Sequence, residues 1–386
     1  MTSYTAPSGR GLKLHTASDV ADFVAEIAAL DDLEEVRLGG NSFGVEAARA
    51  IAAALKPKNS LKVVGFSDMF TGRLKDEIPL ALEAFAEAFE DKKHLVDLDL
   101  SDNAFGPAGA RPLMRLLINN RHIQTLRLNN NGLGIEGGRL ISEALIEAQK
   151  KNDAEGRASA LRVVIAGRNR LESAGAGHLA KAFEAHKDSL TTVRMPQNSI
   201  RPEGVHTLLS SLKHCKNLEH LDLQDNTFTR EGSLALSGAI PHWPNLRVLD
   251  IGDCLLKTAG AGAIIKALTP GSTHLEFLNL GFNEIKEPAA ALLVSMLINK
   301  QKLTTLQLNG NIFDAEDDVV ASIRKVLATH NHEDALDELD EMEEVDEEDE
   351  EDADDHIIVE HHVDAAHEAN DEDMDELTGA VNKLKV

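Results

Sequence analysis

Residues 123–134, IQTLRLNNNGLG, hold the pattern that decides the fold. Written as L-x-x-L-x-L-x-x-N, the stretch places Ile123, Leu126 and Leu128 on a short alternating strand and Asn131 at the turn that follows. The same frame occurs ten times, with its first apolar residue at Leu33, Leu61, Leu95, Ile123, Leu161, Leu190, Leu218, Leu246, Leu275 and Leu303. Most starts lie 28 or 29 residues apart, and two intervals are longer, at 34 and 38 residues.

A period of this length leaves room for a strand and a helix in each turn, which is typical of the long class of leucine-rich repeat. We therefore predict an α/β fold, a leucine-rich-repeat solenoid of the ribonuclease-inhibitor-like horseshoe type. Its parallel sheet should form the concave face, with helices outside, for example over residues 47–55 and 111–118. Residues 1–330 should form one domain, an N-terminal cap followed by ten repeats. In the cap we expect a short strand at Leu12 and Leu14 and a helix over residues 19–30.

The Asn of the frame is predicted to have a structural role. A strand that turns inward leaves backbone amide and carbonyl groups unpaired, and a buried Asn side chain can both donate and accept hydrogen bonds. Eight frames keep it, at Asn41, Asn103, Asn131, Asn169, Asn198, Asn226, Asn283 and Asn311, whereas Met69 and Cys254 replace it in the other two. The eight residues should form a buried ladder along the solenoid.

The two long frames carry additions of different kinds. Between the fourth and fifth frame starts the addition falls in residues 150–159, KKNDAEGRAS, which is predicted to be a loose loop after the helix. In frame two it follows the strand, in residues 67–79, SDMFTGRLKDEIP, where an irregular loop should lead to a helix near Ile78. Loops that depart from the rule of their scaffold are candidates for function, so this second loop is of greater interest.

The residue just before the Asn position should be exposed, because the strand passes into the loop there. Through the first eight frames this column contains Gly40, Asp68, Asp102, Asn130, Arg168, Gln197, Asp225 and Asp253. Such a polar column could form one continuous docking surface. The strand positions that face the concave side, including Arg37, Asp99, Arg127, Arg194 and Asp222, alternate in sign and show no metal-ligand cluster. We therefore expect no metal site.

The charge is concentrated at one end of the chain. The net charge is −26, and residues 331–386 hold 25 Asp or Glu against 2 Lys, which leaves residues 1–330 nearly neutral. A like-charge block of this density cannot bury enough apolar surface to fold, so residues 331–386 are expected to be an acidic, mostly disordered tail. A basic protein is its natural partner, and general nucleic-acid binding is not expected.

Several other functional classes lack their signatures. No GxxxxGK[ST] or GxSxG motif and no plausible Ser/His/Asp set occurs, so an active site of the chain's own is not expected. No apolar run reaches 18 residues and the N-terminus has no signal-peptide core, so we expect no membrane association. Two cysteines and no disulfide framework fit a reducing compartment. We expect the protein to be a monomer and to be located in the cytoplasm or around the nucleus.

Several segments together resemble one family. These are FSDMFTGRLKDEIP (66–79), LSDNAFGP (100–107), LNNNGLG (128–134), GRNRLE (167–172) and LDLQDNTFT (221–229), combined with the acidic tail. They resemble RanGAP, the GTPase-activating protein of the nuclear-transport GTPase Ran, in its fungal form. The resemblance covers nearly all of residues 10–345 and is most specific in the frame-two loop, which the repeat pattern does not require.

The resemblance implies a function and a mechanism. Members of this family bind Ran in its GTP state, with or without Ran-binding proteins, and accelerate hydrolysis without inserting an arginine finger. An Asn that matches Asn130 helps to hold the catalytic Gln of Ran, and the family's loop Arg and Lys match Arg73 and Lys75. No cofactor belongs to the activator itself, because GTP and Mg²⁺ are carried by the GTPase.

The predicted site therefore has Asn130 as its catalytic residue. The predicted partner-binding residues are Arg73, Lys75, Asp76, Asp102, Arg168, Arg170 and Asp225. Chemistry alone favours Arg73 as an arginine finger, the resemblance favours docking or loop shape, and a bond to Asp76 or Glu77 is the structural alternative. The alternative function is a protein-binding scaffold or inhibitor without GTPase-activating activity. Acidic nuclear leucine-rich proteins have shorter repeats, and the 28-residue period disfavours them.

Overall fold

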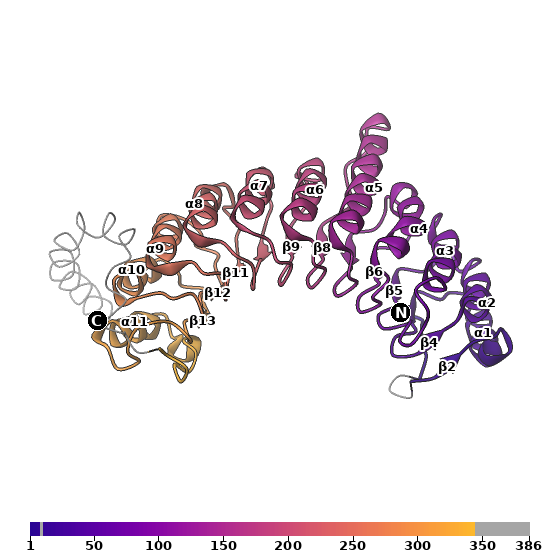
Figure 1. The fold of residues 1–386 in the computed structure, drawn as a ribbon, viewed down its shortest axis with the longest axis horizontal. Helices are drawn as coiled ribbons and strands as arrows, with labels where there is room; N and C mark the ends of the chain where they lie inside the picture. The colour runs from indigo at the N-terminus through magenta and orange to yellow at the C-terminus, as the bar shows by residue number, and fades with distance from the viewer. Residues whose placement is uncertain (8–10, 344–386) are drawn as a thin grey trace, which may run out of the picture.

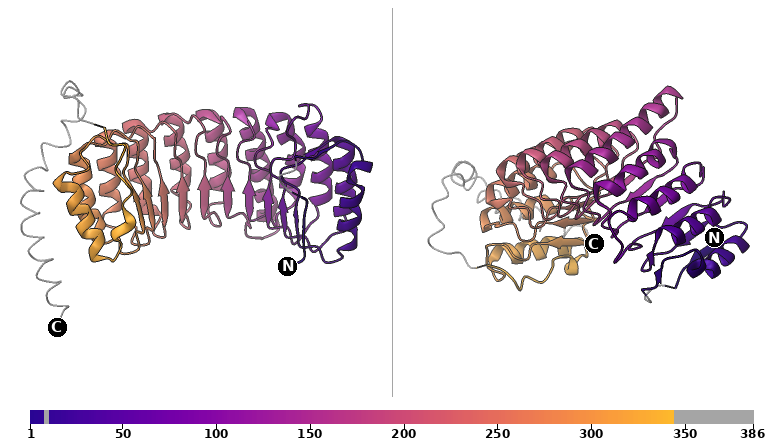
Figure 2. Two further views of the ribbon diagram at one scale, coloured as in Figure 1. Left: turned by 90° about the horizontal axis from the view of Figure 1, so that it is seen from below. Right: turned by 45° about the vertical axis from the view of Figure 1, so that its right-hand side comes forward.

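The computed structural model describes residues 1–7 and 11–343, and the chain in these ranges forms a curved solenoid (Figure 1). Helices cover the outer face of the arc and the strands line its inner face side by side (Figure 2). The predicted leucine-rich-repeat horseshoe is therefore confirmed. Within the described ranges no helix is both long enough and apolar enough to cross a membrane.

One parallel sheet of eleven strands runs through the described part of the chain, and its strands follow one another in sequence order. They are β1 (Ser3–Thr5), β3 (Glu35–Arg37), β5 (Val63–Gly65), β6 (Asp97–Asp99), β7 (Thr125–Arg127), β8 (Val163–Ile165), β9 (Thr192–Arg194), β10 (His220–Asp222), β11 (Val248–Asp250), β12 (Phe277–Asn279) and β13 (Thr305–Gln307). Equivalent frame positions pair across each step, as Leu126 does with Val164. The frame leucines therefore stack into one continuous buried core.

A helix follows each strand of a repeat on the outer face. The helices are α2 (Val45–Leu55), α3 (Ile78–Phe89), α4 (Gly106–Asn119), α5 (Gly134–Ala154), α6 (Glu172–Ala185), α7 (Pro202–Leu212), α8 (Thr229–Ala239), α9 (Lys257–Leu268), α10 (Glu287–Leu297) and α11 (Asp318–Thr329). Two 3-10 turns, η2 (Ile240–His242) and η3 (Glu333–Ala335), follow α8 and α11. The predicted helix near Ile78 is confirmed as α3.

The loose loop predicted for residues 150–159 is wrong over its first half. Helix α5 continues through it to Ala154 and projects beyond its neighbours (Figure 1). A polar sequence favours a loop, but an exposed helical extension needs no apolar face of its own. The helix ends where Gly156 takes a φ of +64°, a conformation that Gly adopts without a steric penalty.

The predicted Asn ladder is present. Asn131 accepts a hydrogen bond from the Asn103 amide at 2.9 Å, and Asn169 accepts one from the Asn131 amide at 3.0 Å. Asn198 and Asn226 continue the series in the same way. All eight Asn side chains are buried, so the ladder satisfies backbone groups that water cannot reach. These residues hold consecutive turns together and leave the positions beside them free to vary.

The N-terminal cap differs from its prediction. The sheet begins with β1 (Ser3–Thr5), which pairs in parallel with β3 and was not predicted. The strand expected at Leu12 and Leu14 is β2 (Lys13–Leu14), but it pairs with β4 (Ser42–Phe43) in a separate two-stranded sheet. The cap helix is present as η1 (Ser18–Val20) followed by α1 (Ala21–Ala29). Tyr4, which is buried, covers the apolar edge that the first repeat would otherwise expose.

The packed structure continues past residue 330, where the sequence placed the start of the acidic tail. Leu336 is buried and forms a bridge to Leu306, and the Asp337 carboxylate accepts a hydrogen bond from the Leu308 amide at 3.0 Å. The Glu343 amide donates to the Asn311 carbonyl at 2.9 Å. The segment 331–343 therefore covers the last turn of the solenoid. The rest of the predicted tail, residues 344–386, lies outside the described residues.

Candidate functional site at the loop rim

The residues just before the ladder position form a line along the rim where strands pass into loops. We call this set of ten the rim column: Gly40, Asp68, Asp102, Asn130, Arg168, Gln197, Asp225, Asp253, Phe282 and Gly310. All ten have a left-handed backbone, with φ from +50° to +76°. Because the next residue is tied into the buried ladder, this turn points each rim side chain away from the core. Most of the ten are exposed or half-buried, as predicted.

Asn130 is exposed, and its amide is held in one orientation. Its backbone N–H donates to the Gly167 carbonyl at 2.9 Å, and its Nδ2 donates to the Asp102 carboxylate at 2.9 Å. Within the described residues the side chain makes no other hydrogen bond, so its second N–H and its Oδ1 remain for a partner. Asp102 thus fixes the Asn130 amide before any partner binds.

The next rim positions place other predicted residues on the same surface. Arg168 is exposed, and its backbone N–H donates to the Pro196 carbonyl at 2.9 Å. Arg170, just past the ladder Asn, is also exposed and has a φ of +54°. Asp225 is half-buried two turns further along. The structure therefore brings Asp102, Asn130 and both arginines to one rim, with Asp225 more distant.

Arg73 lies on the frame-two loop but is turned back onto the N-terminal cap. Its Nε donates to Ser42 Oγ at 2.8 Å, and its Nη2 donates to the carbonyls of Ser42 at 2.7 Å and Leu14 at 3.0 Å. Its Nη1 lies 2.8 Å from His15 Nδ1. The sequence also allowed a bond from Arg73 to Asp76 or Glu77. That alternative is wrong, because the cap and Ser42 of the first repeat hold the guanidinium instead.

Two other polar residues of the frame-two loop are exposed to solvent. Lys75 and Asp76 are exposed, whereas the Glu77 carboxylate accepts a hydrogen bond from the Leu74 amide at 3.2 Å. Ser42 Oγ also donates to the Thr71 carbonyl at 2.7 Å, so Ser42 of the first repeat holds the loop at two points. The Arg73 contacts therefore set the position from which Lys75 reaches solvent.

Comparison with known proteins identifies the family. The leucine-rich repeat family model matches residues 91–114, 119–142, 214–237 and 271–293. Ran GTPase-activating protein 1 of Saccharomyces cerevisiae is 36% identical over 325 residues, which cover 81% of this chain and 79% of that protein. This chain belongs to the Ran GTPase-activating protein family.

Longer relatives are more similar in sequence. Ran GTPase-activating protein 1 of Xenopus laevis is 44% identical over 311 residues, covering 80% of this chain and 53% of that protein. The Ran GTPase-activating protein of Drosophila melanogaster is 44% identical over 308 residues, covering 79% and 52%. The chain thus spans about half the length of these two relatives. A chain of the yeast Rad7–Elc1 complex, at 13% identity and a TM-score of 0.53 over 89% of this chain and 80% of that chain, shares the fold alone.

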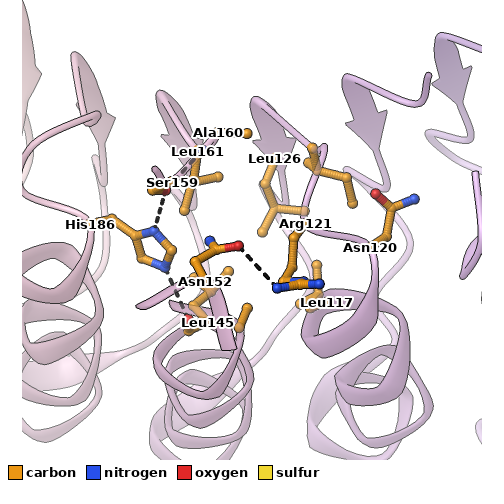
Figure 3. Close-up of a pocket in the computed structure, with 12 residues that line it drawn as sticks. Leu117, Asn120, Arg121, Leu126, Leu145, Asn152, Ser159, Ala160, Leu161 and His186 are labelled. Carbon is orange, nitrogen blue, oxygen red and sulfur yellow. Dashed lines mark hydrogen bonds between the residues drawn. The ribbon is translucent and has the colours of Figure 1, made fainter. Parts of the chain in front are cut away.

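A cavity elsewhere in the solenoid is not a second site. It lies at the opposite end of the strands from the rim column and has a volume of about 20 Å³, room for roughly one water molecule (Figure 3). Ser159 Oγ lies 2.7 Å from His186 Nδ1, and His186 Nε2 lies 3.0 Å from the Leu145 carbonyl. Since Nε2 must donate to that carbonyl and burial lowers the pKa of His186, the imidazole is neutral and structural. Within residues 1–7 and 11–343, no three or more His, Cys, Asp or Glu side chains are grouped in a way that could hold a metal ion.

Asp250 on the concave face has a raised pKa, so its effect on stability can be tested by changing the pH. Burial, and then the neighbouring Asp222 carboxylate, raise the pKa of Asp250 from 3.8 to about 6. A raised pKa means that the folded chain favours the protonated form, so this contribution to stability is complete below 3.8 and is lost as pH rises through about 6. We expect wild type to lose free energy of unfolding across this window relative to Asp250→Asn, measured by urea unfolding. Between about pH 7 and 8 the two curves should run parallel, and parallel curves throughout would contradict the assignment.

Proposed function

We propose that this chain activates GTP hydrolysis by Ran, acting in trans and without a hydrolytic centre of its own. The observation that carries the proposal is Asn130, an exposed amide fixed by Asp102 on the rim of a chain that belongs to the Ran GTPase-activating protein family. Relatives bearing the activity in their names align with about 80% of this chain. GTP and Mg²⁺ would be carried by the GTPase, so the activator supplies only positioned side chains.

In this proposal Asn130 acts on the catalytic Gln of the partner. A primary amide has the same donor and acceptor groups as Asn130, so Asn130 Oδ1 can accept from the Gln NH₂ while its second N–H donates to the Gln carbonyl. Because the Asp102 bond already fixes the amide, little rotational freedom is lost when the partner binds. The neutral amide positions the Gln without adding a charge. Arg168, Arg170 and Lys75 then serve the docking of Ran.

Hydrolysis of GTP by purified Ran, with catalytic amounts of the full-length chain, tests the proposal. An activator acting in trans should turn over and accelerate hydrolysis far above the intrinsic rate at substoichiometric concentration. A scaffold or inhibitor of the leucine-rich-repeat class would bind Ran and leave the rate unchanged or lowered. Binding to the GTP-loaded and GDP-loaded forms should be measured in parallel, because an activator must prefer the GTP-loaded form.

We also propose that the chain acts as a monomer in the cytoplasm. The described sheet ends on one side in β1, an edge strand of three residues, and on the other in β13, which the segment 331–343 covers through the bridge of Leu336 to Leu306, so neither end offers a long open strand to a second copy. Cys215 and Cys254 are both buried and unpaired, which is the usual state of thiols in a reducing compartment. Sedimentation of the purified chain, and fractionation of cells that express it, test the two statements separately.

Substitution of Arg73 should weaken docking more than it slows chemistry. Arg73→Ala removes the bonds to Ser42 and Leu14, so the frame-two loop loosens and Lys75 loses its fixed position. We expect the concentration needed for half-maximal activation to rise roughly tenfold, which is about 1.4 kcal/mol, with most of the saturated rate retained. A titration of the variant against GTP-loaded Ran measures both quantities.

The matched variants for this prediction are Ser42→Ala and Lys75→Ala. Ser42→Ala disturbs the same contacts while keeping the Arg73 charge, so it should show part of the same rise. Lys75→Ala removes the exposed cation and leaves the Arg73 contacts in place. Failure of saturating Arg73→Ala to recover the rate, together with a normal Ser42→Ala, would instead assign Arg73 the role of an arginine finger.

A further inference from the structure

One apolar side chain interrupts the polar rim column. Phe282 occupies the ninth position and is 51% exposed, whereas the eight positions before it hold Gly, Asp, Asn, Arg or Gln. Its φ is +54°, a left-handed value that Gly, Asn and Asp adopt more readily than a bulky residue does. Seven of the ten rim residues are of those three types. The turn itself therefore gives no reason for a phenyl ring at this position.

The ring is held in place by the next turn. A Cβ added to Gly310 would lie 2.2 Å from Phe282 Cδ1 and 2.4 Å from its Cε1, so the ring rests directly on the Gly310 backbone. The Phe282 N–H donates to the Asn309 carbonyl at 2.9 Å. Gly310 is buried beneath the ring while half of the Phe282 surface stays exposed. A ring that is already fixed loses little conformational freedom when a partner covers it.

A second exposed apolar residue lies on the adjacent turn. Leu255 is 40% exposed and also has a left-handed backbone, with a φ of +52°. Two bonds on either side of it, from the Asp253 amide to the Gly281 carbonyl and from the Lys257 amide to the Asn283 carbonyl, join its turn to that of Phe282. We call Leu255 and Phe282 the rim patch. It lies on the same rim as Asn130.

Carboxylates surround the rim patch. Asp225 and Asp253 precede it in the rim column, and Glu284 follows Phe282 by two residues. On the far side, Asp340 is held at the rim by the Asn309 amide at 3.0 Å. Lys257 and Lys286 lie at the starts of the neighbouring helices and are engaged in contacts of their own. This arrangement suits a protein surface on which an apolar side chain is flanked by basic residues.

We propose that the rim patch is a second contact for the GTPase that docks at Asn130, and this inference rests on the proposed function. Neighbouring strands lie about 4.8 Å apart, so the five turns from Asn130 to Phe282 span roughly 24 Å. A domain of about 150 residues has a radius of gyration near 15 Å and thus a diameter of roughly 40 Å, which exceeds this span, so a single domain can contact Asn130 and Phe282 at once. The docking surface then runs from the frame-two loop to the ninth repeat, with an aromatic contact at its far end.

Phe282→Ala in the full-length chain tests the rim patch. The concentration needed for half-maximal activation of Ran should rise roughly tenfold, with the rate at saturation unchanged, because the patch touches no reacting atom. Leu255→Ser should produce a smaller rise in the same direction. Leu234→Ala is the matched control, since Leu234 is 48% exposed on α8 and lies away from the rim, and it should leave both quantities unchanged.

The inference would be overturned if Phe282→Ala and Leu255→Ser both gave half-maximal activation at the same concentration as wild type. If Phe282→Ala unfolds because Gly310 loses its cover, Leu255→Ser decides, since Leu255 does not pack on any glycine of the described residues as Phe282 does. Binding of Ran loaded with a non-hydrolysable GTP analogue separates the two proposals. If even wild type fails to activate hydrolysis, the proposed function is contradicted. If the patch variants also lose binding in that case, the rim patch remains a binding surface.

Discussion

Replacement of Asn130 by Ala should reduce activated hydrolysis on the order of 10²-fold or more while binding of GTP-loaded Ran stays largely intact. The reason is that a bond to the catalytic Gln is strongest in the transition state, whereas the remaining rim residues still dock the partner. The exposed Asn130 side chain bonds only to Asp102 within the described residues, so its loss should leave the fold unchanged. Single-turnover hydrolysis at saturating activator measures the rate, and titration measures the binding.

Asn131→Ala is the control for this result, because it removes an adjacent amide that faces the core. Asn131 is fully buried, accepts from the Asn103 amide and donates to the Leu100 carbonyl at 3.0 Å. Its loss should lower the melting temperature, and any loss of rate should follow the unfolded fraction. The hydrolysis rate with Asp102→Ala should lie between the rates with Asn130→Ala and Asn131→Ala, since this change releases the Asn130 amide without removing it. If Asn130→Ala and Asn131→Ala lost equal amounts of hydrolysis rate because both unfold, the two residues could not be assigned different roles.

The repeat could be predicted from sequence because its physics is local and recurs. Alternating leucines define each strand, the Asn position defines each turn, and stacking requires equivalent positions to pair, as Leu126 and Val164 do. The exposure of Asn130 followed from the same reasoning, because a residue between a strand and a buried Asn131 must point outward. Its proposed role came from the family resemblance, since the repeat itself treats all rim positions alike.

Features that depend on one long-range contact were not predictable in this way. Arg73 bonds to Leu14 and Ser42, which are 59 and 31 residues away, and no local pattern indicates such partners. The strand β1 is three residues long and shows no alternation of its own, because it is formed by pairing with β3. Lys300 is fully buried with its ammonium donating to the carbonyls of Leu268 and Gly271, where composition would place a lysine in solvent.

The rim column shows a similar limit. The sequence predicted its polarity, but the left-handed backbone shared by all ten positions could be seen only in the structure. Once that backbone is known, Gly, Asn and Asp need no further explanation, because they adopt it readily. The presence of Arg168, Gln197 and Phe282 does need an explanation, because residues of these types adopt a left-handed backbone less readily. Departures from a local rule are therefore more informative about function than the rule itself.

Replacement of Asn169 by Ala should cause a large loss of stability. Its Oδ1 accepts from the amides of Asn131 and Leu133, and its Nδ2 donates to three carbonyls, those of Leu128, Ala166 and Gly167. Alanine leaves these buried groups unpaired, at about 1–3 kcal/mol for each group that water cannot reach. We expect the free energy of unfolding to fall by about 3 kcal/mol or more and the melting temperature by on the order of 5 °C.

The same change should also act at a distance. Asn169 joins the turn of Asn131 to that of Asn198, and each turn of a solenoid is stabilised chiefly by its neighbours. Loosening this junction should therefore increase hydrogen exchange in β7 and β8 and reduce activation, because Asn130 bonds to the Gly167 carbonyl across it. Asn311→Ala, at the last turn, is the comparison that decides. It removes a ladder amide of the same kind far from Asn130, so it should lower stability while leaving the saturated rate unchanged. Equal loss of saturated rate in the two folded variants would show that the Asn169 junction has no special role in holding Asn130.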